Sequence, residues 1–323
     1  MKIKSLIFLG VLQCCIFVNA QVKALDPVEY VNPLMGTQSL HSLSNGNTYP
    51  AICRPWGMNF WTPQTGKMGD GWAYIYTAEK IRGFKQTHQP SPWMNDYGQF
   101  SIMPVTGKTV VAEAERGSWF SHKAEVSKPY YYSVYLADYD VTTEITATER
   151  AAHFQITFPE NEQSSIVIDA FDKGSYVKII PSENKIIGYT TRNSGGVSEN
   201  FRNYFVLIFD KPFASNNTWN EKGLVNDKLE LTDDHAGAVV GFKTKKGEKV
   251  NVKVASSFIS LEQAELNLKT ELGTASFDQT VAQSKKEWNK VLGKLTAEGG
   301  TEEQLKTFYS CLYRTACFPQ KQY

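Results

Sequence analysis

The alternation of apolar and polar residues between positions 106 and 260 restricts this 323-residue chain to a few folds. Residues 154–158, Phe-Gln-Ile-Thr-Phe, repeat with the period of two that is typical of a strand buried on one face. Continuous apolar runs at 165–168 and 204–209 indicate strands that are covered on both faces. Because turn-forming residues separate these short segments, the pattern predicts a mainly β protein built as an antiparallel β-sandwich.

After residue 260 the period changes to that of a helix. Residues 261–272 are strong helix formers, and the apolar residues between 277 and 295 repeat on one helical face. Thr301-Glu302-Glu303-Gln304 is a capping box, which predicts a helix that Pro319 stops. Its apolar stripe, Leu305–Tyr313, needs a partner surface. That surface is either the protein's own sheet or a helical domain that begins where this sequence stops.

The N-terminus has the pattern of a secretory signal. Lys2 and Lys4 precede an apolar run, Ser5–Val18, and small residues reach Ala20, where cleavage is expected. An uncleaved membrane anchor is less favoured, because a run of 14 residues is short for a bilayer. A lipoprotein is disfavoured because no small residue precedes either Cys14 or Cys15. The sequence thus predicts an exported protein, periplasmic or extracellular, with a bacterial-type signal.

We therefore predict three parts: a signal peptide at 1–20, a β-sandwich domain at 21–260 and a helical connection at 261–323. An apolar share of 41% excludes a disordered chain. The 34 Lys and Arg nearly balance the 33 Asp and Glu, so charge gives no reason to expect nucleic acid or a membrane surface as a partner. Partners are expected to be neutral or small.

Three cysteines remain after removal of the signal: Cys53, Cys311 and Cys317. An odd number allows at most one disulfide and leaves at least one free thiol. Cys311 and Cys317 are six residues apart and point to different faces if one helix holds both, so they cannot pair there. We expect all three to be buried free thiols.

Familiar catalytic and metal motifs are missing from the sequence. It contains no Gly-x-Gly-x-x-Gly, no Walker loop and no His-Glu-x-x-His, and its five histidines are far apart. Asp70, Glu79 and Asp96 have no spacing that recommends an acid and base pair. The residues themselves therefore give no catalytic carboxylates and no metal ligands.

Aromatic residues are dense between Trp56 and Trp93. Four of the seven tryptophans lie here among glycines, which suits the wall of a pocket where indole rings face the C–H side of a sugar. The polar loop 86–98 follows, stiffened by two prolines, and its short side chains suit hydrogen bonds to hydroxyl groups. Packing in a core is the competing interpretation for any single tryptophan, and Asn95-Asp96 also suits a simple turn.

The motifs in this chain resemble those of glycoside hydrolase family 92, and the likeness extends in order over nearly the whole mature chain. The stretches that carry it are Asn32–Thr37, Asn47–Pro50, Arg54–Met58, Gly71–Tyr74, Ile81–His88, Ile102–Pro104, Ile145–Arg150, Ser256–Ser260 with Gln263–Ala264, Trp288–Asn289 and Phe308–Arg314. Members are exported, calcium-dependent α-mannosidases. The resemblance implies a β-sandwich, a helical connection and then an (α/α)6 barrel, with calcium as cofactor and a mannose-containing glycan as substrate.

The resemblance also implies where the site lies. The family's active site is between its two domains, so this chain would supply one wall, while the acid, the base and the calcium ligands belong to a barrel beyond residue 323. By this analogy we expect Trp61, Trp72 and Trp93 as stacking or packing surfaces. His88 and Asp96 are expected to contact mannose or the loop that shapes the site. The loop after His88 departs from the His-Leu-Ser-Gly pattern of many members, which leaves linkage preference open.

Two functions of different class follow. The favoured one is the N-terminal part of an exo-acting, inverting α-mannosidase, which has no catalytic residue of its own and is inactive alone. The alternative is a free-standing carbohydrate-binding β-sandwich that uses the same aromatic wall without catalysis. A structural sandwich whose aromatic residues are all core is a third interpretation.

Overall fold

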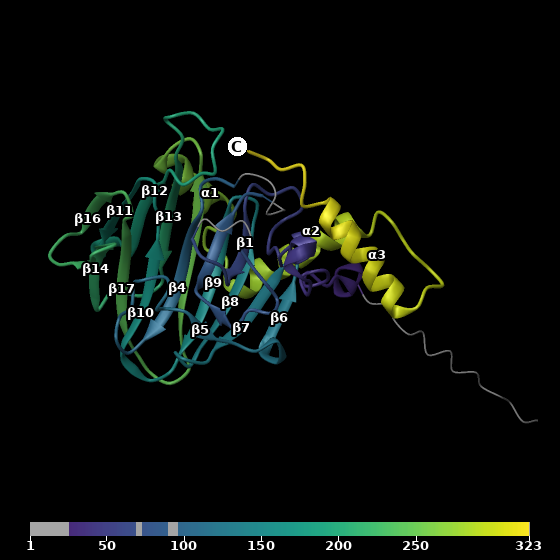
Figure 1. Ribbon diagram of the computed structural model, residues 1–323, viewed down its shortest axis with the longest axis horizontal. Coiled ribbons are helices and arrows are strands. Elements are labelled where there is room, and N and C mark those ends of the chain that lie inside the picture. The colour runs from purple at the N-terminus through teal and green to yellow at the C-terminus, as the bar shows by residue number, and fades with distance from the viewer. Residues whose placement is uncertain (1–25, 69–72, 90–95, 323) are drawn as a thin grey trace, which may run out of the picture.

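Two antiparallel β-sheets stacked face to face form the body of the molecule in a computed structural model, which describes residues 26–68, 73–89 and 96–322. Figure 1 shows the stacked strands with helices α2 (Phe277–Leu292) and α3 (Glu302–Thr315) at one end of them. The mainly β, antiparallel sandwich with helices after it confirms the predicted fold class. Within the described ranges, no helix is both long enough and apolar enough to cross a membrane.

The two sheets are built from strands that are distant in the sequence. The first has seven strands in the order β1 (Phe60–Gln64), β3 (Gly83–Thr87), β4 (Phe100–Thr106), β10 (Asn161–Asp169), β17 (Gly237–Thr244), β14 (Ser215–Asn220) and β15 (Gly223–Val225). The second has nine in the order β16 (Glu230–Asp233), β11 (Ser175–Ile180), β12 (Lys185–Thr190), β13 (Asn203–Phe209), β18 (Glu248–Ser257), β9 (Ala151–Phe158), β8 (Val141–Ala147), β7 (Tyr131–Leu136) and β6 (Glu125–Lys128). A short pair, β2 (Lys80–Ile81) and β5 (Ser118–Trp119), lies beside them.

The core lies between the two sheets. Phe154 and Ile156 of β9 face it from one sheet, and Ile166 of β10 faces it from the other. Strand β10 is buried on both faces over Ile166–Ile168, as its continuous apolar run predicts. The alternating and continuous patterns of the sequence thus correspond to half-covered and fully covered strands.

Helices cover one face of the nine-stranded sheet and one end of the sandwich. Helix α1 (Leu261–Glu271) begins at the cap Ser260 and packs Ala264 and Leu268 on strands β9, β13 and β18. The predicted capping box at Thr301 is present at the start of α3. Short 3-10 helices complete the fold at η1 (Pro27–Tyr30), η2 (His41–Asn47), η3 (His122–Ala124) and η4 (Pro181–Glu183).

Part of the stripe of α3 is covered within this chain, while Phe308 is 38% exposed. Tyr309 and Tyr313 are buried against Val28 of η1 and against Trp288 of α2. Tyr313 also donates a hydrogen bond of 2.6 Å to the carbonyl of Ala51. Because a helical stripe is stable only when another surface covers it, these contacts explain how α3 is held against the sandwich.

The three cysteines among the described residues are free, but one of them is not buried. Cys53 and Cys317 are buried, with their Sγ atoms 3.9 Å apart, whereas Cys311 is exposed. Cys311 lies two residues from both Tyr309 and Tyr313, which places it about 200° away from the packed face of α3. The expectation that all three thiols are buried is therefore wrong for Cys311.

Thiol accessibility follows from this arrangement. In the folded mature chain, a thiol reagent should react rapidly with Cys311 alone, since burial also raises the pKa of the Cys53 thiol and disfavours its reactive thiolate. After unfolding in guanidinium, three thiols should react. Mass spectrometry of the labelled peptides checks the order, and fewer than three labels in the unfolded chain would show that a disulfide had formed.

His153 makes the stability of the sandwich depend on pH. Its side chain in β9 is 2% exposed, and neither ring nitrogen has a hydrogen-bond partner in the described part of the chain. Burial, together with the positive charge of Lys253, lowers the pKa of His153 from 6.5 to about 4. The unfolded chain therefore binds a proton at a higher pH than the folded one does, and the free energy of unfolding falls as pH drops from about 6.5 to about 4.

The expected contribution of His153 over this window is about 3 kcal/mol. His153→Leu should remove it, so the difference in unfolding free energy between the two proteins should change by that amount between pH 7 and pH 4. Urea unfolding at a series of pH values measures it. A constant difference across the series would contradict the assignment.

A second titratable cluster is buried where β10 ends. Asp169 pairs with Arg116 Nη2 at 2.7 Å and with His235 Nε2 at 2.8 Å, and the Arg116 and Asp169 side chains are both 0% exposed. The remaining Arg116 nitrogens donate to the carbonyls of Arg82 and Val111, both at 2.9 Å. Burial by itself would raise the pKa of Asp169, but the charges of Arg116 and His235 lower it below its usual value. This network ties the seven-stranded sheet to the loop that precedes β5.

Candidate functional site

Three segments that are distant in the sequence meet beside the end of α3. They enclose a cavity of about 270 Å³. Its lining consists of Met35, Gly36, Gly46, Asn47, Thr48, Tyr49, Ala51, Arg314 and Cys317. Three of the sequence stretches singled out above, 32–37, 47–50 and 308–314, thus converge on one hollow.

The segment Ser44–Asn47 forms one wall in an unusual backbone conformation. All four residues have positive φ, at 56°, 47°, 78° and 50°. Asparagine and glycine adopt the left-handed region at little cost, but a run of four is rare and costs on the order of 1–3 kcal/mol for each strained position. Such strain persists only where neighbouring structure enforces it, and it is typical of functional sites.

Gly46 shows what enforces that conformation. A Cβ atom placed on Gly46 would lie 1.6 Å from the carbonyl oxygen of Gly36, so the two backbones touch. Arg314 of α3 holds the Gly36 side of this contact, because its Nη2 donates to the carbonyls of Pro33 at 3.0 Å and Met35 at 2.8 Å. The helix that follows the sandwich therefore fixes the wall of the cavity.

Asp96 joins the two described ends of the segment that follows β3, residues 87–89 and 96–99. Its carboxylate accepts hydrogen bonds from the Thr87 hydroxyl at 2.5 Å, from the backbone N–H of His88 at 3.1 Å and of Tyr97 at 2.8 Å, and from the Gln99 amide. A carboxylate has room for about four such bonds. The contacts of Asp96 in this structure are therefore with the loop that shapes the site.

His88 is enclosed within the same loop. It is 0% exposed, its ring is stacked on Tyr97, and Nδ1 lies 2.7 Å from the carbonyl of Tyr97. Burial lowers the pKa of His88, so the ring is neutral with its proton on Nδ1. Its Nε2 is then an acceptor, and it has no partner in the part of the chain that the structure describes.

The two loops are joined by Tyr49. Its hydroxyl donates to the carbonyl of Gln89, and burial keeps the pKa of Tyr49 far above its usual value, so the phenol stays protonated. One side of Tyr49 lines the 270 Å³ cavity, and its hydroxyl end contacts the His88 loop. The cavity and the Asp96 loop are thus parts of one site.

The three predicted tryptophans have different outcomes. Trp61 is 0% exposed in the core of the sandwich, where it packs edge-on against Phe100 and Phe154. An indole enclosed on all sides offers no face to a sugar, so for Trp61 the packing alternative holds and a ligand-contacting role is corrected. Trp72 and Trp93 lie outside the described residues, and their roles stay predictions.

Sequence reasoning did not single out Ser44, Asn45, Tyr49 or Arg314 as site residues. The signal for the left-handed segment is present, because Asn45-Gly46-Asn47 contains the residues that tolerate positive φ. Arg314 ends the stretch Phe308–Arg314 that carries the family resemblance, but its contacts cannot be predicted locally, since they are made with carbonyl groups that lie about 280 residues earlier.

The described residues do not form a metal site. No group of three or more His, Cys, Asp or Glu side chains in these ranges is placed to hold an ion. Calcium takes six to eight oxygen ligands, usually with several carboxylates among them, and the described residues bring no three such side chains together. No chemical step through calcium is therefore derived for this chain.

Comparison with known proteins identifies the segments on either side of residue 260. Residues 30–257 match the Glycosyl hydrolase family 92 N-terminal domain. Residues 263–323 match the Glycosyl hydrolase family 92 catalytic domain. The boundary between the matches coincides with the change from the last strand, which ends at Ser257, to α1.

Solved structures similar to this chain include two mannosidases. The family GH92 inverting mannosidase BT2199 from Bacteroides thetaiotaomicron is 47% identical, with a TM-score of 0.89 over 92% of this chain and 40% of its own. The GH92 α-mannosidase BT3965 from the same species is 29% identical, with a TM-score of 0.82 over 92% and 42%. An uncharacterized secreted glycosidase from Arthroderma benhamiae is 21% identical over 99% of this chain and 45% of its own. The chain thus spans less than half the length of these relatives.

Proposed function

The chain belongs to glycosyl hydrolase family 92, and from this premise we propose that it is the N-terminal part of an exo-acting, inverting α-mannosidase. In this proposal it supplies one wall of the active site, binds the mannose-containing glycan there and is inactive alone. The observation that carries the proposal is the convergence of the family's stretches 32–37, 47–50 and 308–314 on the 270 Å³ cavity. The name of the Arthroderma relative supports export of the protein.

In the proposed inverting mechanism, this wall has no catalytic role. An inverting glycosidase uses one carboxylic acid to protonate the leaving oxygen and one carboxylate to activate water, about 6.5–9.5 Å apart. The carboxylate that the cavity loop provides, Asp96, accepts hydrogen bonds from the loop itself. We propose that the acid, the base and the calcium ligands belong to the remainder of the catalytic domain, of which this chain contains the first helices.

The contribution of this chain is to hold the sugar in place. The backbone at Ser44–Asn47 is held by Gly36 and Arg314, and Asp96 ties residues 87–88 to residues 97–99 through its hydrogen bonds. A rigid polar wall can orient a sugar ring without changing its own conformation when the sugar binds. Positioning residues increase the reaction rate mainly through such orientation of the substrate. Trp72 and Trp93 remain proposed surfaces for the sugar ring.

A chimera tests the proposal. Residues 26–323 of this chain would replace the corresponding part of BT2199, whose 47% identity favours a native interface. We expect no release of mannose from α-mannobiose by the 323-residue chain, and hydrolysis by the chimera with β-mannose as the first anomer seen by NMR. BT2199 itself is the positive control.

Two results would contradict the proposal. Release of mannose by the 323-residue chain would show that it has a complete site, whereas a folded but inactive chimera would show that it does not supply the wall. Binding of mannobiose by the 323-residue chain with an inactive chimera would favour the free-standing carbohydrate-binding module.

A further inference from the structure

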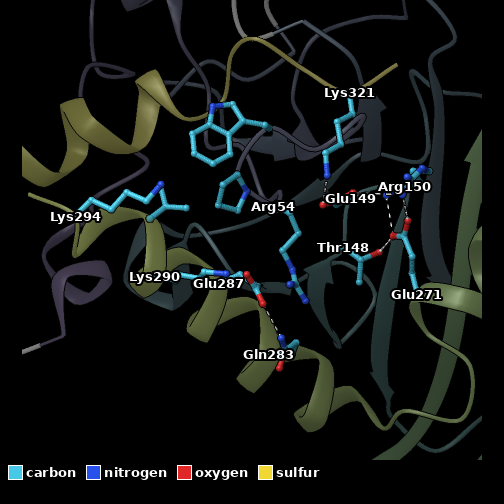
Figure 2. A pocket seen from close by; sticks show the side chains of 13 residues that line it. Arg54, Thr148, Glu149, Arg150, Glu271, Gln283, Glu287, Lys290, Lys294 and Lys321 are labelled. Carbon is cyan, nitrogen blue, oxygen red and sulfur yellow. Dashed lines mark hydrogen bonds and ion pairs between the residues drawn. The ribbon is translucent and has the colours of Figure 1, made fainter. Parts of the chain in front are cut away.

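A second cavity, of about 540 Å³, lies between the sandwich and helices α1 and α2 (Figure 2). It shares no lining residue with the cavity at Tyr49. Its walls come from residues 54–56, from the turn 148–150, from the end of α1, from α2 and from Lys321. The volume is within the range of pockets that bind small molecules, about 300–1,000 Å³.

Positive charge exceeds negative charge in this cavity. Five cations and three carboxylates line it. Two of the carboxylates pair with cations of the cavity, and the third, Glu287, accepts from the Gln283 amide at 2.8 Å. Glu271 accepts from Arg150 at 2.5 Å and from the Thr148 hydroxyl at 2.6 Å. Glu149 pairs with Lys321 at 2.7 Å, as Figure 2 also shows. An excess of two positive charges is therefore left for a ligand.

Arg54 is the cation best placed to use that excess. Its Nε donates to the carbonyl of Ala147 at 3.1 Å, while its two Nη atoms have no hydrogen-bond partner in the described part of the chain. Figure 2 shows its guanidinium between Glu287 and Thr148. The charges of Glu287, Glu271 and Glu149 act on Arg54, but no carboxylate in the described ranges forms an ion pair with it. These Nη atoms are not among the buried atoms that lack a partner, so they are open to the solvent of the cavity, where a bound oxyanion can accept from both in parallel.

Two lysines at the end of α2 extend the positive wall. Lys290 lies in the last turn of α2, Lys294 lies in the turn that follows the helix, and neither makes an ion pair within the described ranges. Lys294 Nζ lies 5.9 Å from the centre of the Trp56 ring. Cations and an aromatic face therefore occur together at the same end of the cavity.

Trp56 is held in a strained conformation with its ring partly open to solvent. Its φ is 55° and it is 37% exposed, although bulky residues rarely adopt positive φ. Two backbone hydrogen bonds hold it there: its N–H donates to the carbonyl of Ala316 at 2.8 Å, and the Lys321 N–H donates to its carbonyl at 3.1 Å. An exposed indole that is fixed in this way suits the C–H face of a sugar ring.

We propose that this cavity binds a sugar that carries a carboxylate or a phosphate group, with the anion on Arg54 and Lys290 and the ring against Trp56. The guanidinium fork matches the geometry of both oxyanions. The site is separate from the mannoside wall, so binding here does not depend on the proposed glycosidase activity.

Calorimetry on the 323-residue chain at low ionic strength tests the proposal with four probes: inorganic phosphate, mannose 6-phosphate, glucuronate and mannose. We expect mannose 6-phosphate or glucuronate to bind at least about tenfold more tightly than mannose, as loss of a charge-assisted hydrogen bond implies. Whichever of the two binds more tightly identifies the anion. Equal affinity for charged and neutral sugars, or no binding of any probe, would overturn it.

Variants locate the site. Lys290→Gln and Arg54→Gln should each weaken binding about tenfold or more, whereas Lys286→Gln, an exposed lysine of α2 outside the cavity, should leave the Kd unchanged. Trp56→Asn keeps a residue that tolerates positive φ but removes the ring. It should weaken binding of the sugar anion and leave that of inorganic phosphate within about twofold, if phosphate binds. An unchanged Kd in both Lys290→Gln and Trp56→Asn would refute the site even if Arg54→Gln does not fold.

Discussion

Asp169→Asn should lower the free energy of unfolding by about 3–5 kcal/mol, the largest stability effect that we expect from a single substitution. The change removes the charge that faces Arg116 Nη2 at 2.7 Å while the guanidinium stays buried at 0% exposure. It also removes the acceptor of His235 Nε2 in its charged form. A buried charge without its partner is costly, because the interior cannot replace the lost interaction with water.

Urea unfolding at pH 7 measures this effect. Glu162→Gln is the matched control, since it removes one carboxylate from an ion pair with Lys243 whose side chains are 80% and 70% exposed. That change should stay within about 0.5 kcal/mol, as exposed pairs usually do. If the two variants lost similar amounts of unfolding free energy, the buried ion pair of Asp169 would contribute no more to stability than an exposed pair does.

Asp96→Ala should lower kcat/KM of the BT2199 chimera by about 10- to 100-fold. The substitution leaves the donors at Thr87, His88, Tyr97 and Gln99 without their shared acceptor, so residues 87–88 and 97–99 beside the cavity are expected to shift. A displacement of about 1 Å in a residue that positions a substrate costs about 100-fold in rate. Asp96 acts here as a positioning residue, because its oxygens bind the loop.

Asp96→Asn separates positioning from folding. The asparagine carbonyl still accepts from the N–H groups of His88 and Tyr97, so activity should recover in part. Asp138→Ala, which removes an exposed carboxylate elsewhere in the sandwich, should leave kcat/KM unchanged. Wild-type activity in a folded Asp96→Ala chimera would remove the loop from the site.

Much of the architecture follows from local sequence. The alternation at 154–158 predicts a strand with one buried face, and β9 has that form because neighbouring side chains of any strand point to opposite faces. The capping box at Thr301 predicts the start of α3 for an equally local reason, since the groups that bond there are three residues apart. The stretches of the family likewise predict the sandwich and the helices after it.

The site was predictable only in part. The loop 86–98 was expected near it, and Asp96 does organise this loop. Trp61 lies in the aromatic-rich segment that suggested a pocket wall, but it belongs to strand β1, which points its side chain into the core. The direction in which a side chain points depends on the register of β1 with its neighbours, which the spacing of aromatic residues does not encode.

The sequence by itself determined the helices and strands of this protein and their order, because these depend on residues that are near one another in the chain. Its short motifs also determined the family of the protein. Tertiary structure alone decided which distant residues meet. The contact of Gly46 with Gly36, the clamp of Arg314 on Met35 and the pair of Asp169 with Arg116 all join backbone or side-chain groups across the fold. These contacts depend on the order of the strands in the sheets and on how the helices pack against the sheets. The periodicity of apolar residues in the sequence carries no information about strand order or helix packing.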